Sequence, residues 1–562
     1  MKKCILTALA LGMTVPAVAA DDFDWSRATV YFVITDRFSN GDTTNDNNYG
    51  RINDYGSERM NAATFHGGDF AGMLAKAREG YFKKLGIDVV WMTDVYEQLH
   101  GWMSGSGNVN DFPHYGYHGY YPLDYTQIDK NYGTVEEFRA LVDELHSQGI
   151  RVMLGANLNN PGYPTLLDAQ QYGFASIGNA TDAAAHNSAW SYDDWAAGMG
   201  DWADWWTREW LRTSDEKWDE SNPLTTTLYG LPDFKTEKTE AVKIPAFLKK
   251  KWAREGHSND AWVNPTAAAL RVDRDAAPAD YVVDWIAAWV EEFGIDGFRC
   301  DIVEYVHLPR WRQLKDACDA ALEKWRRNHP DDRAASWTDK FYMTGDCEFA
   351  SIDRRDDYAS AGFSSLVNFY FPKRGDLDAI VDVWQQYADS VTAHSDWHPF
   401  SYLNNSYNRD ADPDRMSECG ITLLLAPGAV QLFYGDESGR GLSDAQYNVD
   451  AAQAFRSDMN WNTADTALMS HYAKLGNIRS AHPSIGRGKQ TTLDAHTCAR
   501  TSGEDTVVIT VAPVEGRPVP VGDFFKDGED VVDLYSGQKL KVEDHSLKFI
   551  PRGAKVAVFA RP

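Results

Sequence analysis

The sequence predicts an α/β fold: a (β/α)8 TIM barrel with an insertion domain after strand three and a C-terminal antiparallel β domain. Short apolar runs alternate with helical segments eight times along the chain. One interval between runs is much longer than a single helix needs, and near the end the pattern changes to short β-rich runs separated by turns. A chain of 562 residues is long enough for two or three domains with a large core.

The eight apolar runs are the expected barrel strands. Segments between them, such as 134–149, have helical apolar spacing and end at glycine. The runs lie at residues 28–35, 87–93, 149–157, 294–300, 341–345, 366–371, 400–404 and 430–435.

The domain boundaries follow from these patterns. Residues 1–20 combine two lysines, an apolar stretch and the A-x-A signal of Ala17 to Ala19, so we expect a cleaved signal peptide and a periplasmic or secreted protein. Residues 21–486 form the expected barrel, which includes an insertion domain at 157–278. Residues 487–562 form the expected C-terminal β-sandwich. No later apolar run approaches the roughly 18 residues that span a bilayer.

The amino-acid composition argues against some classes of binding partner. The net charge of -27 argues against nucleic acid and against an anionic membrane. The 20 tryptophans and 13% aromatic content fit a large core and a sugar-binding cleft equally well. We expect a monomer.

Five cysteines follow the expected leader, and their spacings match no zinc pattern. Buried inert thiols are the default interpretation for Cys300 and Cys347. A disulfide that involves Cys300, Cys318 or Cys347 stays open, given the expected export.

Arg299 and Asp301 stand two residues apart at the end of the fourth expected strand. Alternate strand residues share a face, so both side chains point the same way. The C-terminal ends of barrel strands are where such barrels build their active sites.

The architecture and several motifs resemble the α-amylase family of glycoside hydrolases. "GFRCD" is similar to the family's fourth-strand motif, "LPDFKTE" to its insertion-domain motif and "GAVQLFYGDES" to its eighth-strand motif. "TFHGGDFAGM", "EQLHGW", "DFPHYGYHGYY" and "RSDMNW" resemble the periplasmic α-amylases of Gram-negative bacteria. The resemblance covers nearly the whole mature chain.

The resemblance implies a retaining mechanism, in which a carboxylate nucleophile and a carboxylic acid stand roughly 5 to 5.5 Å apart across the scissile bond. Asp301 would be the nucleophile, with Arg299 keeping it ionised. His118 and Tyr120 would line the adjoining sugar subsite, with Tyr120 as a stacking face. Trp91 and Trp102 are equally consistent with core and with cleft.

The catalytic positions depart from the family pattern. Asp346 stands where the family has its acid Glu. Its shorter side chain would place the carboxyl roughly 1 to 1.5 Å farther from the scissile bond. A misplacement of about 1 Å can reduce the reaction rate about 100-fold. Glu348 would substitute if its loop bends inward. Ser406 and Tyr407 replace a His-Asp pair after strand seven. The acidic residues that follow fit a solvated loop better than a relocated carboxylate; they are Asp410, Asp412 and Asp414.

Two other strand ends depart as well. After strand three, Gly155 replaces an Asp and Asn160 replaces the His that touches the sugar, whereas Asn159 keeps the family's Asn. After strand four, Glu304 stands where Lys is common and Tyr305 where a further His is usual. These losses converge on one pocket.

The resemblance also implies Ca²⁺. Asn and Asp in loops are usually turn formers, but closely spaced oxygen ligands are what Ca²⁺ prefers. The first expected site comprises Asn40, Asp42, Asn45, Asp46, Gly67 and Asp69. A second would use Asn159, Asp233 and a backbone carbonyl near Tyr305.

The favoured interpretation is an exported protein that recognises α-1,4-glucans such as starch and maltodextrin, with hydrolysis absent or much weakened. One alternative is an active retaining α-amylase or transglycosylase that uses Asp301 as nucleophile and Asp346 or Glu348 as acid. The other is a non-enzymatic interaction scaffold on the same fold.

Overall fold

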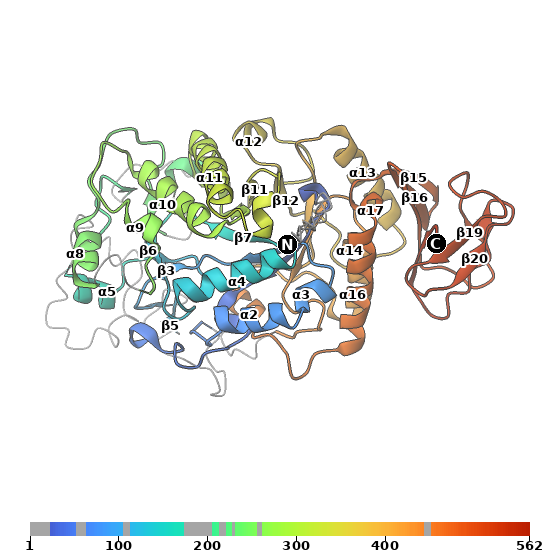
Figure 1. The fold of residues 1–562 in the computed structure, drawn as a ribbon, viewed down its shortest axis with the longest axis horizontal. Coiled ribbons are helices and arrows are strands. Elements are labelled where there is room, and N and C mark those ends of the chain that lie inside the picture. Colours follow the sequence, from blue (N-terminus) through green and yellow to red (C-terminus); the bar gives the residue numbers. More distant parts are fainter. Residues whose placement is uncertain are drawn as a thin grey trace, which may run out of the picture.

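The barrel lies at the centre of the molecule (Figure 1). The computed structural model describes residues 23–51, 63–104, 113–173, 205–212, 221–226, 231–255, 261–442 and 451–562. Within these residues eight parallel strands close in the order β1-β14-β13-β12-β11-β10-β7-β2. The strands are β1 (Thr29–Val33), β2 (Val89–Met92), β7 (Arg151–Ala156), β10 (Gly297–Cys300), β11 (Tyr342–Gly345), β12 (Ser365–Asn368), β13 (Phe400–Tyr402) and β14 (Ala429–Phe433).

The barrel strands are apolar because both of their faces are covered. Every residue of β1, β2, β7, β10 and β14 is buried, as expected for strands with side chains inside and helices outside. Each of the eight predicted runs overlaps one barrel strand, which confirms the fold class. The barrel closes where Thr29 of β1 pairs with Val430 of β14.

Helices cover the outside of the barrel, and their ends follow local sequence signals. Helix α4 begins with a capping box between Thr134 and Glu137, and α10 ends at Gly294, whose φ of 73° suits glycine. The covering helices are α2 (Phe70–Arg78), α3 (Tyr81–Lys84), α4 (Val135–Ser147), α10 (Pro278–Phe293), α11 (Leu308–Asn328), α12 (Asp356–Ser360), α13 (Ile380–Ala393), α14 (Met416–Leu424), α16 (Thr466–Ala481) and α17 (Pro483–Arg487). Two short helices lie in the loops after β1 and β14, α1 (Thr35–Phe38) and α15 (Ala451–Phe455).

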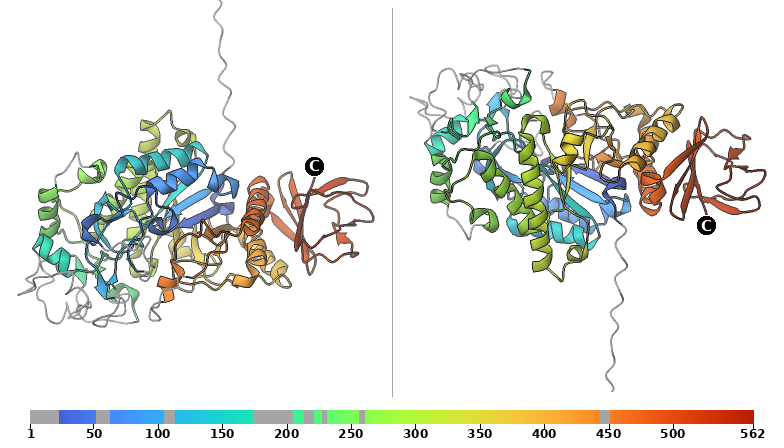
Figure 2. Two further views of the ribbon diagram at one scale, coloured as in Figure 1. Left: turned by 90° about the horizontal axis from the view of Figure 1, so that it is seen from below. Right: turned by 90° about the horizontal axis from the view of Figure 1, so that it is seen from above.

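Two long connections extend the barrel at one end. The connection from β2 to β7 carries β3 (Tyr96–Gln98), β4 (Met103–Ser104), β5 (Pro113–His114) and β6 (Pro122–Ile128). The insertion after β7 carries α5 (Leu166–Tyr172), β8 (Leu211–Arg212), β9 (Asp233–Phe234), α8 (Ala246–Glu255) and α9 (Pro265–Ala268). Figures 1 and 2 show these elements at the opposite end of the molecule from the C-terminal sheet.

The C-terminal domain is an antiparallel sheet of six strands with a two-stranded sheet beside it. Its outer face meets the barrel helices through Arg500, which donates hydrogen bonds to the carbonyls of Leu425 and Ile485 at 2.5 and 2.8 Å. The six strands are β15 (Lys489–Asp494), β16 (Thr497–Ser502), β17 (Asp505–Val511), β22 (Val556–Ala560), β19 (Asp530–Asp533) and β20 (Lys539–Lys541). The pair is β18 (Val519–Pro520) and β21 (Ser546–Leu547).

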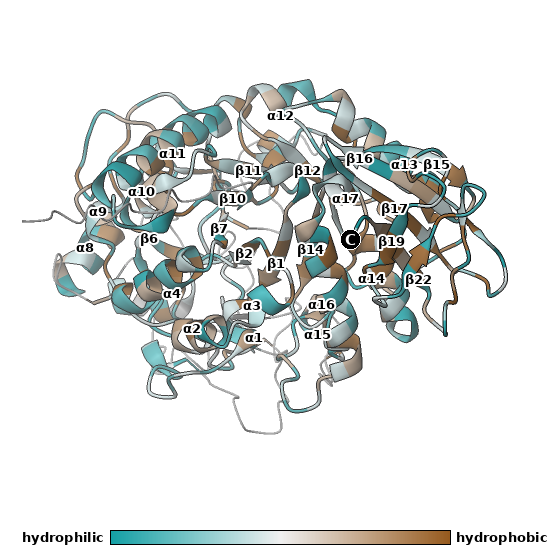
Figure 3. Cartoon of the chain, turned by 45° about the vertical axis from the view of Figure 1, so that its right-hand side comes forward, coloured by the Kyte–Doolittle hydropathy of each residue, from teal (hydrophilic) through white to brown (hydrophobic). Residues whose placement is uncertain are grey.

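Hydropathy follows this layering: apolar colour gathers on barrel strands such as β1, and polar colour lies along the outer helices (Figure 3). Among the described residues, no helix combines the length and apolar character that crossing a membrane requires. The expected leader lies outside the described residues. Five buried cysteines in the described chain carry free thiols, so the disulfide left open by the sequence is absent among them: Cys300, Cys318, Cys347, Cys419 and Cys498.

Candidate active site

Two neighbouring strand ends bring the sequence-predicted carboxylates to one rim of the barrel. Cys300 of β10 pairs with Gly345 of β11, and the ladder continues because the Asp346 N–H donates to the Cys300 carbonyl at 2.9 Å. The Asp301 N–H in turn donates to the Ala156 carbonyl of β7 at 3.1 Å. Asp301 and Asp346 therefore both lie one residue beyond the C-terminal end of their strands.

The Arg299 guanidinium joins the two carboxylates. One terminal nitrogen donates to Asp301 Oδ1 and the other to Asp346 Oδ2. The Tyr407 hydroxyl accepts a hydrogen bond from Arg299 at 3.3 Å and donates to Asp301 Oδ1 at 3.2 Å. Tyr407 thus contacts both Arg299 and Asp301.

Burial and neighbouring carboxylates set the charge of Asp346. Burial raises its pKa to about 6, Asp301, Glu304 and Glu348 add to the rise, and Arg299 opposes it. An Asp carboxyl with this pKa is protonated in about half of the molecules at pH 6 and in about a tenth of them at pH 7.

Glu348 and Glu304 lie beside this pair. The Glu348 side chain is exposed, and its backbone N–H donates to Glu304 Oε1 at 2.9 Å. Glu304 Oε2 is buried without a hydrogen-bond partner in the described part of the chain, and burial raises the pKa of this carboxyl. Glu304 is therefore the more buried of the two glutamates.

The predicted sugar-binding residues His118 and Tyr120 lie together, and Tyr120 lies next to Ser406 and Tyr407. The His118 and Tyr120 rings are stacked with centroids 5.1 Å apart, and the Tyr120 hydroxyl lies 3.4 Å from Ser406 Oγ. His118 Nε2 is buried and has no partner among the described residues, while burial keeps the imidazole pKa well below its usual value. A neutral histidine with an open nitrogen can bind a ligand hydroxyl. The Arg299 guanidinium lies over the Trp91 ring, with its central carbon 5.3 Å from the ring centroid.

Strand three positions a group that the sequence reasoning missed. A Cβ atom on Gly155 would run into Asp94 Oδ1, closer than real Cβ atoms approach. Asp94 follows β2, is 1% exposed, and has its pKa raised well above the usual value by burial and by Asp301. An acidic residue directly after the apolar run "VVWMT" was the available signal.

Asn160, the predicted sugar contact, is tied into its own turn. Its side-chain oxygen accepts from Asn157 Nδ2 at 3.1 Å, and its amide nitrogen donates to the Pro161 carbonyl at 3.0 Å. The residue is buried at 1% exposure. Both ends of its side-chain amide are therefore engaged within the protein.

The first predicted calcium loop has two buried side-chain oxygens without hydrogen-bond partners in the described chain. They belong to Asn40 and Asn45, and Asn40 Nδ2 donates to Asp46 Oδ1 at 2.7 Å. Gly67, with a φ of 92°, packs so closely that an added Cβ would strike Asp46 Oδ1. Unsatisfied buried oxygens of this kind suit a hard cation.

Asp42 and Asp69 fit this predicted site less well. The Asp42 carboxylate turns outward to the Thr44 hydroxyl at 2.7 Å. The Asp69 carboxylate caps α2 and accepts from the backbone N–H groups of Gly41, Asp42 and Gly72 at 2.7 to 2.9 Å. Backbone donors therefore already use the Asp69 oxygens.

The second predicted metal group converges on one point. One end of the Asn159 side-chain amide lies 2.9 Å from Asp233 Oδ1 and 3.2 Å from the Tyr305 carbonyl oxygen. With its nitrogen turned toward them, Asn159 donates to both; with its oxygen turned toward them, three oxygens meet as around Ca²⁺. Asp233 also pairs with Arg212 at 2.8 Å. Among the described residues, no group of three or more His, Cys, Asp or Glu side chains could hold a metal.

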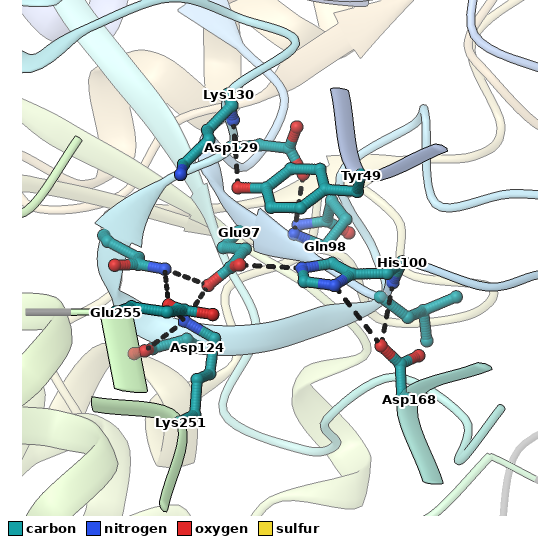
Figure 4. Close-up of polar contacts among 12 residues, drawn as sticks. Tyr49, Glu97, Gln98, His100, Asp124, Asp129, Lys130, Asp168, Lys251 and Glu255 are labelled. Carbon is teal, nitrogen blue, oxygen red and sulfur yellow. Dashed lines mark hydrogen bonds and ion pairs between the residues drawn. The ribbon is translucent and has the colours of Figure 1, made fainter. Parts of the chain in front are cut away.

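A buried charge network joins the connection between β2 and β7 to helix α8 of the insertion (Figure 4). The Lys251 ammonium of α8 lies 2.5 Å from Glu97, 3.2 Å from Asp124 and 2.6 Å from Glu255. His100 Nε2 donates a hydrogen bond to the other Glu97 oxygen at 2.8 Å. Sequence reasoning missed this network because its members are far apart along the chain.

A closed (β/α)8 barrel with an insertion after its third strand and carboxylates on neighbouring strand ends defines a glycoside-hydrolase type of protein. Residues 32–344 match the family of the α-amylase catalytic domain. The chain belongs to the α-amylase family.

Individual relatives agree with this assignment. The periplasmic α-amylase of Escherichia coli K12 is 38% identical over 524 residues, which cover 87% of this chain and 72% of that protein. The β/α-amylase of Paenibacillus polymyxa is 26% identical over 558 residues, which cover 96% of this chain and 38% of that protein. The crystal structure of an Anoxybacillus α-amylase has the same fold, with a TM-score of 0.63, 19% identity and coverage of 96% of this chain and 99% of that chain.

Proposed function

We propose that the protein binds α-1,4-linked glucans such as maltodextrin, with hydrolysis absent or much weakened. The observation that carries this proposal is the engagement of Arg299 with both Asp301 and Asp346. A retaining hydrolase needs one carboxylate placed to attack and one carboxyl placed to donate a proton across the scissile bond. Here the guanidinium that pairs with the expected nucleophile also holds the expected acid Asp346, whose side chain is one methylene shorter than the family's Glu.

The strand-seven substitution supports the same conclusion. Tyr407 brings a neutral hydroxyl to the place where the family has an Asp, so the pocket lacks one preorganised charge. Loss of such a group commonly reduces the rate by about 10² to 10³. His118 Nε2, which is buried without a partner in the described chain, can bind a sugar hydroxyl.

An active hydrolase or transglycosylase is the second candidate. It is favoured by the Asp346 pKa of about 6, because a carboxyl with this pKa can donate a proton near neutral pH. In this case Asp301 would attack and Asp346 would serve as the acid.

Calcium and export belong to the same proposal. Asn40, Asn45, Asp46 and Gly67 fit a Ca²⁺ site because two buried amide oxygens of the loop have no protein partner in the described chain. A bound ion would fix this loop beside the barrel. A periplasmic or secreted location is supported by the leader pattern of residues 1–20 and by the similarity to a periplasmic α-amylase.

Titration with maltoheptaose, followed by product analysis, tests the proposal. We expect saturable binding with little release of reducing sugar. Turnover in the usual enzyme range of about 1 to 10³ per second, abolished by Asp301→Asn, would favour the hydrolase instead. Failure to bind any maltooligosaccharide would favour an interaction scaffold.

A further inference from the structure

Phe349 occupies a backbone position that normally belongs to glycine. The Ala350 N–H donates to the Cys347 carbonyl at 3.0 Å, which closes a four-residue turn with Phe349 as its third residue. The φ of Phe349 is 61°, in the left-handed region. Turns of this geometry select Gly or Asn at the third residue, and a bulky side chain there is an outlier.

Burial offers no compensation for this strain, because the Phe349 side chain is 68% exposed. A strained backbone persists where other demands maintain it, and such residues cluster at ligand-binding sites. An exposed phenyl ring on a strained turn therefore points to a role at the surface rather than in folding.

Tyr370 provides a second exposed aromatic ring on the neighbouring loop. Its side chain is 63% exposed. The residue before it, Phe369, donates its N–H to the carbonyl of Ala350, the residue after Phe349, at 3.0 Å. This backbone bond holds the two aromatic turns together just outside β11 and β12, which are paired at Gly345 and Leu366.

We infer that Phe349 and Tyr370 form a stacking surface for an α-glucan chain that extends out of the pocket; the inference rests on the proposed function. Phe349 follows the pocket carboxylate Asp346 by three residues on the same strand-end loop, so the surface adjoins the pocket. The faces of glucose rings are apolar and pack on aromatic rings. A neutral polymer also suits a protein with a net charge of -27, which would repel an anionic one.

Calorimetry with maltotriose and maltoheptaose tests this surface in the full-length protein and in Phe349→Gly and Tyr370→Ala. Because only the longer sugar reaches beyond the pocket, we expect about 3- to 10-fold weaker maltoheptaose binding in each variant and unchanged maltotriose binding. Phe349→Gly should also raise the melting temperature, since glycine relieves the left-handed backbone.

Two control variants make comparable substitutions at exposed positions away from the pocket. Arg552→Gly replaces another exposed residue with positive φ (49°), and Val514→Ala trims another exposed apolar side chain (60% exposed). Neither should change the affinity for either sugar.

The failures are distinguishable. If the unmodified protein binds neither sugar, the proposed function is wrong, and the inferred stacking surface then has no glucan to bind. If it binds maltoheptaose and both variants keep its affinity, only the stacking surface is wrong. A Phe349→Gly protein that loses maltotriose binding and melts at a lower temperature would make Phe349 a structural residue, which also overturns the inference.

Discussion

The carboxylate of Asp94 occupies the space that a side chain on Gly155 would fill. The two residues lie at the ends of β2 and β7, which are neighbouring strands. Burial and Asp301 raise the pKa of Asp94 and Arg299 opposes the rise, so an acidic group lies near Arg299 and Asp301. That group follows strand two, whereas the family resemblance predicts an acidic group on strand three.

This exchange predicts a reciprocal pair of substitutions. Gly155→Asp should lower the free energy of unfolding by about 1 to 3 kcal/mol, because the new side chain collides with Asp94. Asp94→Ala combined with Gly155→Asp should recover most of this loss, since only one carboxylate then occupies the space. Denaturant unfolding of the single and double variants provides the measurement. A double variant as unstable as Gly155→Asp alone would show that the two side chains do not exchange.

Restoring the family's residues should restore hydrolysis. The triple variant Asp346→Glu, Ser406→His, Tyr407→Asp supplies the acid and the strand-seven charge, which together suggest a gain of at least about 10² in rate. Single restorations can remain silent because such groups act as a unit. Reducing-sugar release from maltoheptaose is the readout, and adding Asp301→Asn should abolish it. A folded triple variant that binds without hydrolysing would show that the assigned positions are wrong.

The raised pKa of Asp346 predicts how any residual hydrolysis depends on pH. With a pKa of about 6, the proton-donating form increases as the pH falls from 8 through 6, so the rate should rise over this range. Asp346→Asn should remove this part of the pH profile. The folded state also binds this proton more tightly than the unfolded chain, so the contribution of Asp346 to stability should increase as the pH falls from about 6 toward 4. Rates that are independent of pH between 6 and 8 would exclude Asp346 as the acid.

Calcium should stabilise the loop that contains Asn40, Asn45 and Asp46. A ligand that binds only the folded state raises the melting temperature, so a chelator should lower it and added Ca²⁺ should restore it. Asp46→Ala should remove this response. Asp42→Ala is the matched control, because the Asp42 carboxylate faces Thr44 and should leave the response intact. A chelator response that survives Asp46→Ala would place the ion elsewhere.

The Lys251 network should be sensitive to removal of its cation. Lys251→Met leaves Glu97 and Asp124 buried without their cation, which commonly costs about 3 to 5 kcal/mol. Lys250→Met changes an exposed neighbour on the same helix and should change stability by less than about 0.5 kcal/mol. Equal stabilities of the two variants in urea would contradict the assignment of Lys251 as the central cation.

The stability of the protein at low pH provides a second test of the Lys251 network, because Glu97 is ionised within it. Burial acts to raise the pKa of Glu97, but Lys251 and His100 together lower it below its usual value. The stability that this group supplies is present above the unfolded pKa of about 4.3 and is lost as the pH falls toward the lower folded value. In Lys251→Met, acid destabilisation below about pH 4 should be much reduced, as measured by thermal unfolding.

The sequence was sufficient for the barrel because its strands are continuous apolar runs with a distinct local pattern. The sequence also predicted that Arg299, Asp301 and Asp346 lie close together, since the C-terminal ends of the strands of a parallel barrel lie on one rim. Asp94 and the Lys251 network were missed because their partners are set by tertiary packing rather than by spacing. The strain at Phe349 was likewise invisible, because residue type alone does not reveal a positive φ.

The pairing of Thr29 with Val430 has a consequence for how the chain acquires its structure. During synthesis β1 and β2 emerge early, yet the last neighbour of β1 is made only when the eighth strand appears. Until then the growing chain presents an open sheet with bare backbone groups, the condition that favours edge-to-edge association. A chain that ended before residue 429 would keep that edge permanently, so ribosome-bound and shortened forms should depend on chaperones far more than the finished protein.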